Sequence, residues 1–223
     1  MNSFIKKIIL YTFKNIIFKQ LKKNILESRM STSISDNQIY PNFCIKASTD
    51  LSVFSNFRRN NHYRKILEHT SYEDGIDYLI EISKSKIEIE KHLKQFKQND
   101  LWGNPELYDY PKIGKISPST LRYLKVFTDL MLIFKKLDEL KICEIGVGYG
   151  GQCRIINCAT SPSEYVLVDI KPALMLTQCY LDNYILHSVI KYKTMNELEI
   201  KDYDLVISNY AFTELPRDIQ DVY

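Results

Sequence analysis

Residues 144–151 read Glu-Ile-Gly-Val-Gly-Tyr-Gly-Gly, and this stretch decides the fold. A short apolar run at residues 141–145 predicts a strand that enters the glycines, and residues 151–159 are expected to form a helix. A glycine-rich turn between a strand and a helix lets the backbone approach a nucleotide closely. The segment therefore predicts the first strand, loop and helix of a nucleotide-binding α/β domain.

The same alternation continues toward the carboxyl end. Strands are expected over residues 164–169, 189–194 and 203–208, a helix over 172–186, and the start of another helix over 218–223. Strands that alternate with helices imply a parallel sheet with right-handed crossovers. Residues 139–223 are thus interpreted as a Rossmann-like α/β domain.

Three parts precede this domain. Residues 1–30 read as a basic amphipathic helix, with six lysines and Arg29 against Glu27 alone, a net charge of +6. Such a helix can lie on an anionic membrane surface, so peripheral membrane contact is one expectation and packing on the domain or on a partner is the other. Residues 31–59, rich in Ser, Thr, Asn and Asp, predict a linker.

Residues 60–138 are expected to form a helical region before the sheet. Helices are predicted at about 60–69, at 71–97 with Ser71 as N-cap, and at 117–137 with Ser117 as N-cap and proline next. A loop is expected between the last two of these helices.

Composition excludes several classes of protein. A net charge of +3 over 223 residues is too mild to indicate nucleic acid, so no such partner is expected. The five cysteines form no C-x-x-C and have no histidine at ligand spacing, which favours reduced thiols in the cytoplasm and no metal site. No run reaches the roughly 18 to 20 apolar residues of a membrane span.

Polar side chains are expected at the edge of the sheet where its strands end, and ligands bind at this edge in open α/β sheets. Glu144 stands two residues before the first glycine. Asp169 closes the second strand and can accept two ribose hydroxyls, or cap the next helix. Asn209, after the fourth strand, can face a ligand or serve only the turn. Arg122, on the preceding helix, can reach the ligand or remain solvated.

The glycines alone fit two templates. Gly146, Gly148 and Gly151 match the G-x-G-x-x-G of dinucleotide binders, which leaves an NAD-dependent sugar epimerase or dehydrogenase as an alternative. Gly146, Gly148 and Gly150 match the G-x-G-x-G of methyltransferases. Glu144 favours the second template, because a carboxylate there would repel an anionic pyrophosphate.

Three longer segments carry a resemblance: Cys-Glu-Ile-Gly-Val-Gly-Tyr-Gly-Gly-Gln at 143–152, Tyr-Val-Leu-Val-Asp at 165–169, and Asp-Leu-Val-Ile-Ser-Asn-Tyr-Ala-Phe-Thr-Glu-Leu at 204–215. Together with Ser-Pro-Ser-Thr-Leu-Arg-Tyr at 117–123 they look like the sugar O-methyltransferases of bacterial surface-polysaccharide clusters. The resemblance covers about residues 60–223. It implies a class I methyltransferase that uses S-adenosyl-L-methionine to methylate a hydroxyl of a sugar or glycan.

The resemblance also implies roles for single residues. Glu144 would hold the methionine ammonium and Arg122 the methionine carboxylate, Asn209 would lie near the sulfonium, and Met195 near adenine. Glu214 is the candidate general base, which a weakly nucleophilic sugar hydroxyl needs. The residues expected to bind the cofactor are Glu144, Gly146, Gly148, Tyr149, Gly150, Asp169, Ile170, Met195, Asn209 and Arg122.

The family's sheet has seven strands in the order 3-2-1-4-5-7-6, whereas this sequence predicts four, in the order 3-2-1-4. We therefore expect a truncated class I sheet. One alternative is an amino-terminal fragment that pairs with a separate chain, and another is a non-catalytic remnant of a methyltransferase.

Overall fold

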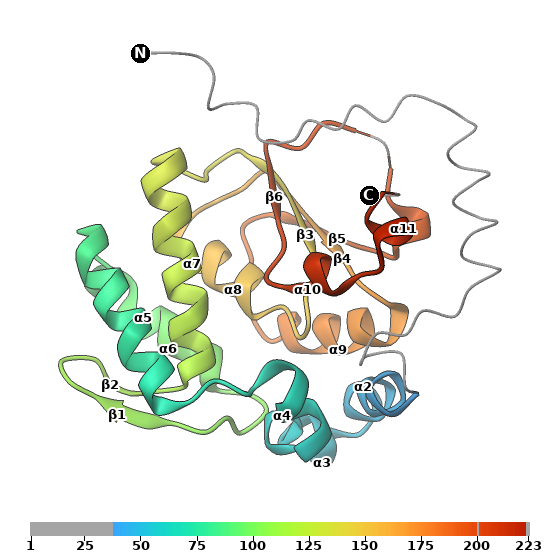
Figure 1. Ribbon diagram of the computed structural model, residues 1–223, viewed down its shortest axis with the longest axis horizontal. Coiled ribbons are helices and arrows are strands. Elements are labelled where there is room, and N and C mark those ends of the chain that lie inside the picture. Colours follow the sequence, from blue (N-terminus) through green and yellow to red (C-terminus); the bar gives the residue numbers. More distant parts are fainter. Residues whose placement is uncertain (1–37, 200, 222–223) are drawn as a thin grey trace.

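The glycine loop lies in a four-stranded parallel sheet. The structure is a computed structural model and describes residues 38–199 and 201–221. The strands are in the order β5-β4-β3-β6, which counted within this sheet alone is the predicted order 3-2-1-4. The α/β class is confirmed (Figure 1). The strands and their helices are β3 (Lys141–Ile145), α8 (Gly151–Ala159), β4 (Glu164–Val168), α9 (Lys171–Leu181), β5 (Val189–Lys193) and β6 (Leu205–Ile207).

The strand register brings the predicted ligand-binding residues to one edge. Ile145 pairs with Val168 across β3 and β4, and Glu144 pairs with Ile207 across β3 and β6. The glycine loop, Asp169 and the segment after β6 therefore leave the sheet side by side, as parallel strands require.

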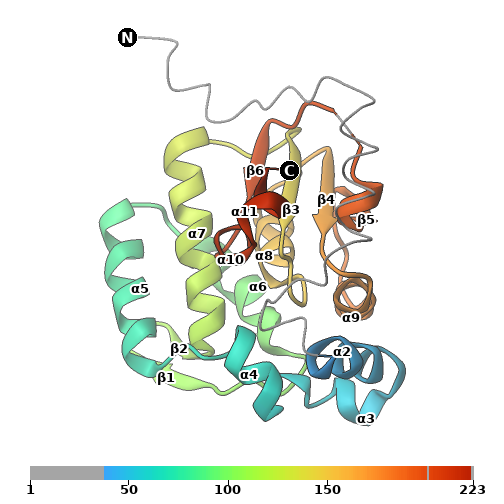
Figure 2. The ribbon, with the colours of Figure 1, turned by 45° about the vertical axis from the view of Figure 1, so that its right-hand side comes forward.

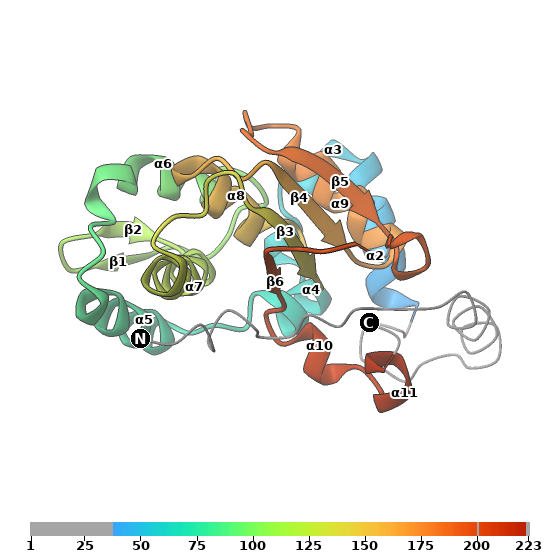
Figure 3. The ribbon, with the colours of Figure 1, turned by 90° about the horizontal axis from the view of Figure 1, so that it is seen from above.

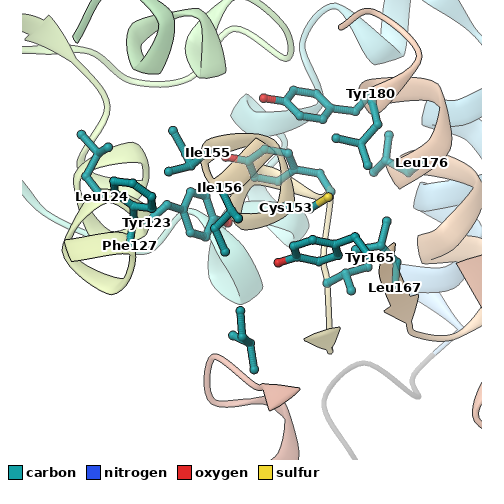
Figure 4. Close-up of a cluster of buried hydrophobic side chains, with 14 of the residues drawn as sticks. Tyr123, Leu124, Phe127, Cys153, Ile155, Ile156, Tyr165, Leu167, Leu176 and Tyr180 are labelled. Carbon is teal, nitrogen blue, oxygen red and sulfur yellow. The ribbon is translucent and has the colours of Figure 1, made fainter. Parts of the chain in front are cut away.

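Helices α8 and α9 cover one face of the sheet, and α7 (Pro118–Phe134) lies beside them (Figure 3). Figure 4 shows how side chains of four elements meet in this layer: Tyr123 and Phe127 from α7, Ile156 from α8, Tyr165 from β4 and Leu176 from α9. All five are buried, so this layer forms the main core. A smaller core on the other face contains Cys143, Ile145, Val166 and Val168.

The helices before the sheet begin at the predicted caps. Ser117 Oγ accepts the Thr120 N–H at 3.1 Å, and proline occupies the first turn of α7. Ser71 and Asp74 form a reciprocal capping box at the start of α5 (Tyr72–Ser85), which packs along α7 (Figure 2).

The single helix predicted over residues 71–97 is wrong. Helix α5 ends at Ser85, because Lys86 adopts the left-handed conformation with φ 58°. The chain then turns, so that Ile89 and Phe96 both reach the core. The turn is followed by the short helices η3 (Glu90–His92), α6 (Leu93–Lys97) and η4 (Gln98–Asp100).

The linker predicted over residues 31–59 is also wrong wherever the structure describes it. Residues 39–59 are mostly helical, and α2 packs against α9. Tyr40, Cys44 and Ala47 recur at helical spacing and are buried, which the many polar neighbours concealed. The elements are α2 (Ile39–Thr49), α3 (Leu51–Phe54) and η2 (Phe57–Arg59), followed by α4 (Asn61–Leu67). Residues 31–37, and the helix predicted over residues 1–30, lie outside the described residues.

Two further details were not predicted. The loop before α7 contains an antiparallel hairpin, β1 (Tyr108–Tyr110) with β2 (Gly114–Ile116). The short helix α10 (Ala211–Glu214) is the second of these details, whereas the helix expected to start at residue 218 is present as α11 (Arg217–Gln220). Over residues 38–199 and 201–221, no helix is both long enough and apolar enough to cross a membrane.

Candidate functional site

The glycine loop adopts a conformation that only glycine takes easily. Gly146 and Gly148 have φ values of 76° and 57°. Added Cβ atoms would lie 2.0 Å from Ala211 Cβ at Gly146, and 2.9 Å from Leu67 Cδ1 at Gly148. The Leu67 side chain of α4 and Ala211 at the start of α10 can therefore pack directly against the loop at the sheet edge.

Glu144 contributes a buried carboxyl group that has no cationic partner among the described residues. Its side chain is 2% exposed, and Oε2 accepts a hydrogen bond from the Tyr165 hydroxyl at 2.7 Å. Burial, together with the negative charge of Asp169, raises the pKa of Glu144 to about 8. Among the described residues, none with a positive charge lies within ion-pair distance of it, so the carboxyl can accept a cation from a ligand.

Asp169 follows β4 and faces the loop. Its Oδ2 accepts the Gly148 N–H at 3.2 Å, and its Oδ1 accepts the Ile170 N–H at 2.7 Å. Burial raises the pKa of Asp169 to about 6, against the lowering effect of these backbone hydrogen bonds. Each oxygen keeps a lone pair that can accept a ligand hydroxyl. The carboxylate is therefore both a structural partner of the loop and a candidate ribose ligand.

Arg122 is buried rather than solvated. It is 7% exposed, and its guanidinium lies 5.4 Å from the centre of the Tyr123 ring. Nη2 donates to the Leu67 carbonyl at 3.3 Å, whereas Nε has no hydrogen-bond partner. Because the Leu67 side chain contacts Gly148, this unpaired cation lies one residue away from the glycine loop. It can bind an anionic group of a ligand.

The segment after β6, the strand that pairs with β3, borders the site on that side of the sheet edge. Asn209 Nδ2 donates to Gln152 Oε1 at 3.4 Å, which ties the segment to the first turn of α8. Tyr210 follows with φ 73° and is exposed. Ser208 Oγ accepts the Phe212 N–H at 2.9 Å at the start of α10. Asn209 therefore lies at the predicted edge, and Glu214 is exposed at the end of α10.

The other predicted cofactor residues lie in different surroundings. Met195 is half-buried and begins η5 (Met195–Glu197) after β5, and Ile170 is exposed after Asp169. The Tyr149 ring is fully buried, with the Arg58 guanidinium 4.8 Å from its centre and Tyr180 edge-on at 4.9 Å. The ring anchors the loop to the helical region, so only the backbone of Tyr149 is left to face a ligand.

A buried polar network that the sequence did not reveal supports this anchor. Arg58 Nε lies 2.8 Å from Glu68 Oε1, and Arg58 Nη1 lies 3.0 Å from Asp100 Oδ1. The Ser117 hydroxyl links Arg58 and Asp100, since it accepts a hydrogen bond from Arg58 and donates one to Asp100. Arg58 falls inside the supposed linker, and no periodic pattern connects it with partners 10 and 42 residues away.

Only some of the buried charged residues have an ion-pair partner. Among the described residues, the buried charged side chains are Arg58, Glu68, Arg122, Glu144 and Arg154. Arg58 and Glu68 neutralise each other, and the other three have no ion-pair partner within that part of the chain. The Glu144 carboxyl, which is mostly neutral at pH 7, and the Arg122 guanidinium both lie beside the glycine loop, so the site can pair with the ammonium of a ligand once Glu144 ionises, and with its carboxylate. No family model, curated protein or solved structure matches the chain.

Proposed function

We propose that the chain binds S-adenosyl-L-methionine and transfers its methyl group to a hydroxyl of a sugar or glycan in surface-polysaccharide biosynthesis, in the cytoplasm. The observation that carries the cofactor proposal is a pair of buried ionisable groups without an ion-pair partner among the described residues, the Glu144 carboxyl and the Arg122 guanidinium, beside a glycine loop. A nucleoside joined to an amino acid matches these groups. The acceptor class is taken from the sequence resemblance.

The residues present fit such a cofactor. Glu144 ionises and binds the ammonium, and Arg122 binds the carboxylate, which gives the Arg122 guanidinium the counter-ion that it lacks in the described part of the free protein. An unpaired buried charge is costly, and charge-assisted hydrogen bonds are about twice as strong as neutral ones. Asp169 accepts the ribose hydroxyls, and Met195 lies beside the adenine.

The chain's own contribution to the reaction is positioning and proton removal. S-adenosylmethionine supplies an electrophilic methyl group when it is bound. Asn209 borders this position from the segment after β6, and Glu214 follows one helical turn later. Glu214 accepts the proton of the acceptor hydroxyl, which makes the oxygen a better nucleophile.

A dinucleotide fits the same residues less well. The pyrophosphate of NAD would approach a loop that follows the buried carboxyl of Glu144 by two residues, and it could not pair with that carboxyl in its ionised form, whereas an ammonium could. The charge of Glu144 therefore favours an ammonium-bearing ligand over an NAD-dependent epimerase or dehydrogenase.

The proposal is tested in two steps on the full chain. Calorimetric titration with S-adenosylhomocysteine and with NAD measures cofactor choice, and methyl-labelled cofactor with a panel of sugars, nucleotide sugars and glycans measures transfer. Arg122→Met and, as a matched exposed control, Arg217→Met are titrated in parallel. We expect S-adenosylhomocysteine to bind the wild type and the control alike, and labelled methyl to appear on an acceptor.

The outcomes separate the alternatives. Tight binding of NAD without binding of S-adenosylhomocysteine overturns the cofactor proposal. Binding without transfer to any acceptor favours a non-catalytic remnant. A Glu214→Gln variant that keeps near-normal turnover removes Glu214 as the base and leaves the cofactor site intact.

A further inference from the structure

Arg154, the third buried charge without an ion-pair partner among the described residues, is in the first turn of α8, where its backbone N–H donates to the Gly150 carbonyl at 3.0 Å. The residue is 3% exposed. Its guanidinium lies 4.6 Å from the centre of the Tyr184 ring. Among the described residues, its side chain donates to neutral acceptors, the Phe96 carbonyl at 3.4 Å and Gln98 Oε1 at 3.2 Å. Within residues 38–199 and 201–221, no carboxylate lies within ion-pair distance, so the charge has no counter-ion.

Arg154 borders a cavity of about 280 Å³, close to the lower end of the range for small-molecule pockets, roughly 300–1,000 Å³. We call it the Arg154 pocket. Gln95 and Gln98, Tyr184 and His187 line it with Arg154, and none of its lining residues is acidic. The pocket is therefore positive in charge, and its lining combines these polar side chains with the apolar ones of Ile185 and Leu186.

The chain segment that forms one wall offers further donors. Asn183 and Tyr184 donate their backbone N–H groups to the carbonyls of Tyr180 and Leu181. The next three N–H groups, those of residues 185–187, donate to no acceptor in the described part of the chain. Successive unpaired N–H groups form concavities that bind anions. They belong to the wall at residues 183–187, and α8, which carries Arg154, forms the other side of the pocket.

The Arg154 pocket is distinct from the proposed methyl-transfer site. Its wall at residues 185–187 leads into β5, whose first residue Val189 pairs with Glu164 at the start of β4. This wall therefore lies toward the edge where the strands begin, whereas the glycine loop lies where they end, and none of the lining residues belongs to the proposed methyl-transfer site. On its other side are α6 and α8, which pack together (Figure 3).

We propose that the Arg154 pocket binds a phosphate-class oxyanion, either inorganic phosphate or the phosphate group of a phosphorylated sugar. A guanidinium presents a fixed fork of N–H donors that matches phosphate oxygens. The bound anion supplies the missing counter-ion for a charge whose burial is otherwise costly. This site is independent of the proposed methyl transfer.

Phosphorus NMR titration of the full chain at constant ionic strength tests the site. Inorganic phosphate and glucose 1-phosphate are the two probes, and Arg154→Met and Arg217→Met are the test and control variants. We expect wild type and control to bind with a dissociation constant of about 1 mM or tighter, and Arg154→Met to bind at least about tenfold more weakly. The tighter of the two probes identifies the source of the phosphate, and equal affinities mean that the phosphate group alone is recognised.

Two further measurements distinguish a loss of phosphate binding from a folding defect. S-adenosylhomocysteine binding of Arg154→Met is expected to equal that of the wild type, because the two sites are separate. His187→Ala changes an exposed lining residue and is expected to weaken phosphate binding a few-fold without changing urea unfolding. Absence of phosphate binding by the wild type at about 10 mM, or equal binding by Arg154→Met, would overturn the proposal.

Discussion

Replacing Glu144 with glutamine is expected to stabilise the protein at neutral pH. The pKa of this carboxyl is about 8 in the folded chain, against an ordinary value of 4.5. The folded protein therefore holds a proton at about pH 7 that the unfolded chain has lost. Keeping this proton lowers the free energy of unfolding by about 1.4 kcal/mol for each pH unit above 4.5, or by about 3 kcal/mol at pH 7.

The sign of this effect follows from the direction of the shift. A raised carboxyl pKa means that stability falls as pH rises from about 4.5 to about 8, and that the cost vanishes below this window. Glutamine has no such cost. Its oxygen can still accept from Tyr165, but its N–H groups lack an acceptor, which costs about 1 kcal/mol. The net gain is about 2 kcal/mol at pH 7 and none at about pH 5.

The same substitution should weaken the cofactor. Glutamine cannot neutralise the ammonium, so affinity for S-adenosylhomocysteine should fall roughly 30-fold, which corresponds to about 2 kcal/mol. Wild-type affinity should rise between about pH 6 and pH 8, because the neutral carboxyl must ionise before it pairs. The affinity of Glu144→Gln should lack that pH dependence.

Urea unfolding and calorimetric titration at about pH 5 and pH 7.5 measure both effects. Glu88→Gln is the matched control, because Glu88 is exposed and a hydrogen bond from Lys91 lowers its pKa. The reasoning is refuted if Glu144→Gln is less stable than the wild type at both pH values, or if it binds S-adenosylhomocysteine as tightly.

Three other substitutions test neighbouring features. Arg122→Met should weaken S-adenosylhomocysteine binding at least about tenfold in calorimetry, while the free energy of unfolding in urea falls by only about 1 kcal/mol through loss of the hydrogen bond to the Leu67 carbonyl; unchanged affinity would contradict its role. Gly148→Ala should lower the free energy of unfolding by about 1–3 kcal/mol, because of its φ and the contact with Leu67, and a neutral effect in urea would contradict this. Arg58→Met should cost about 3–5 kcal/mol in urea by leaving the Glu68 carboxylate unpaired, and Arg58→Met combined with Glu68→Leu should cost less than the sum.

The sheet was predictable from the sequence because its signals are local. The strand at 141–145 and the helix at 151–159 have the predicted bounds, since an apolar run, a glycine turn and a helix follow one another without interruption. The ends of the later elements were less certain. The helix expected over 172–186 stops at Leu181, because Asp182 and Asn183 turn toward β5.

The helical region was predicted less well, because its structure depends on distant contacts. Residues 38–59 look like a polar linker, yet Phe57 and Arg58 are completely or almost completely buried against Tyr149. Helix α5 ends before Lys86, where the sequence has no glycine or proline that would indicate a helix end. The sequence likewise placed Arg122 on the correct helix without deciding whether it was buried, since burial depends on how α4 and α5 pack over α7.

In the candidate site too, the residues at strand ends were predictable from the sequence, whereas features that depend on distant contacts were not. Glu144, Asp169 and Asn209 were identified from their places at strand ends, and the register brings them to one edge of the sheet. Tyr149 was expected at the ligand, but its ring is part of the core. That the charges of Glu144 and Arg122 are unpaired emerges only from the three-dimensional contacts.

The central claim is that Glu144 and Arg122 bind the amino-acid part of a nucleoside ligand. Parallel titrations with S-adenosylhomocysteine and 5′-methylthioadenosine test it most directly, because the second compound has the same adenosine without the ammonium and carboxylate. The pair of charged contacts predicts that S-adenosylhomocysteine binds at least about 100-fold more tightly at pH 7.5. Equal affinity for the two compounds would contradict the claim.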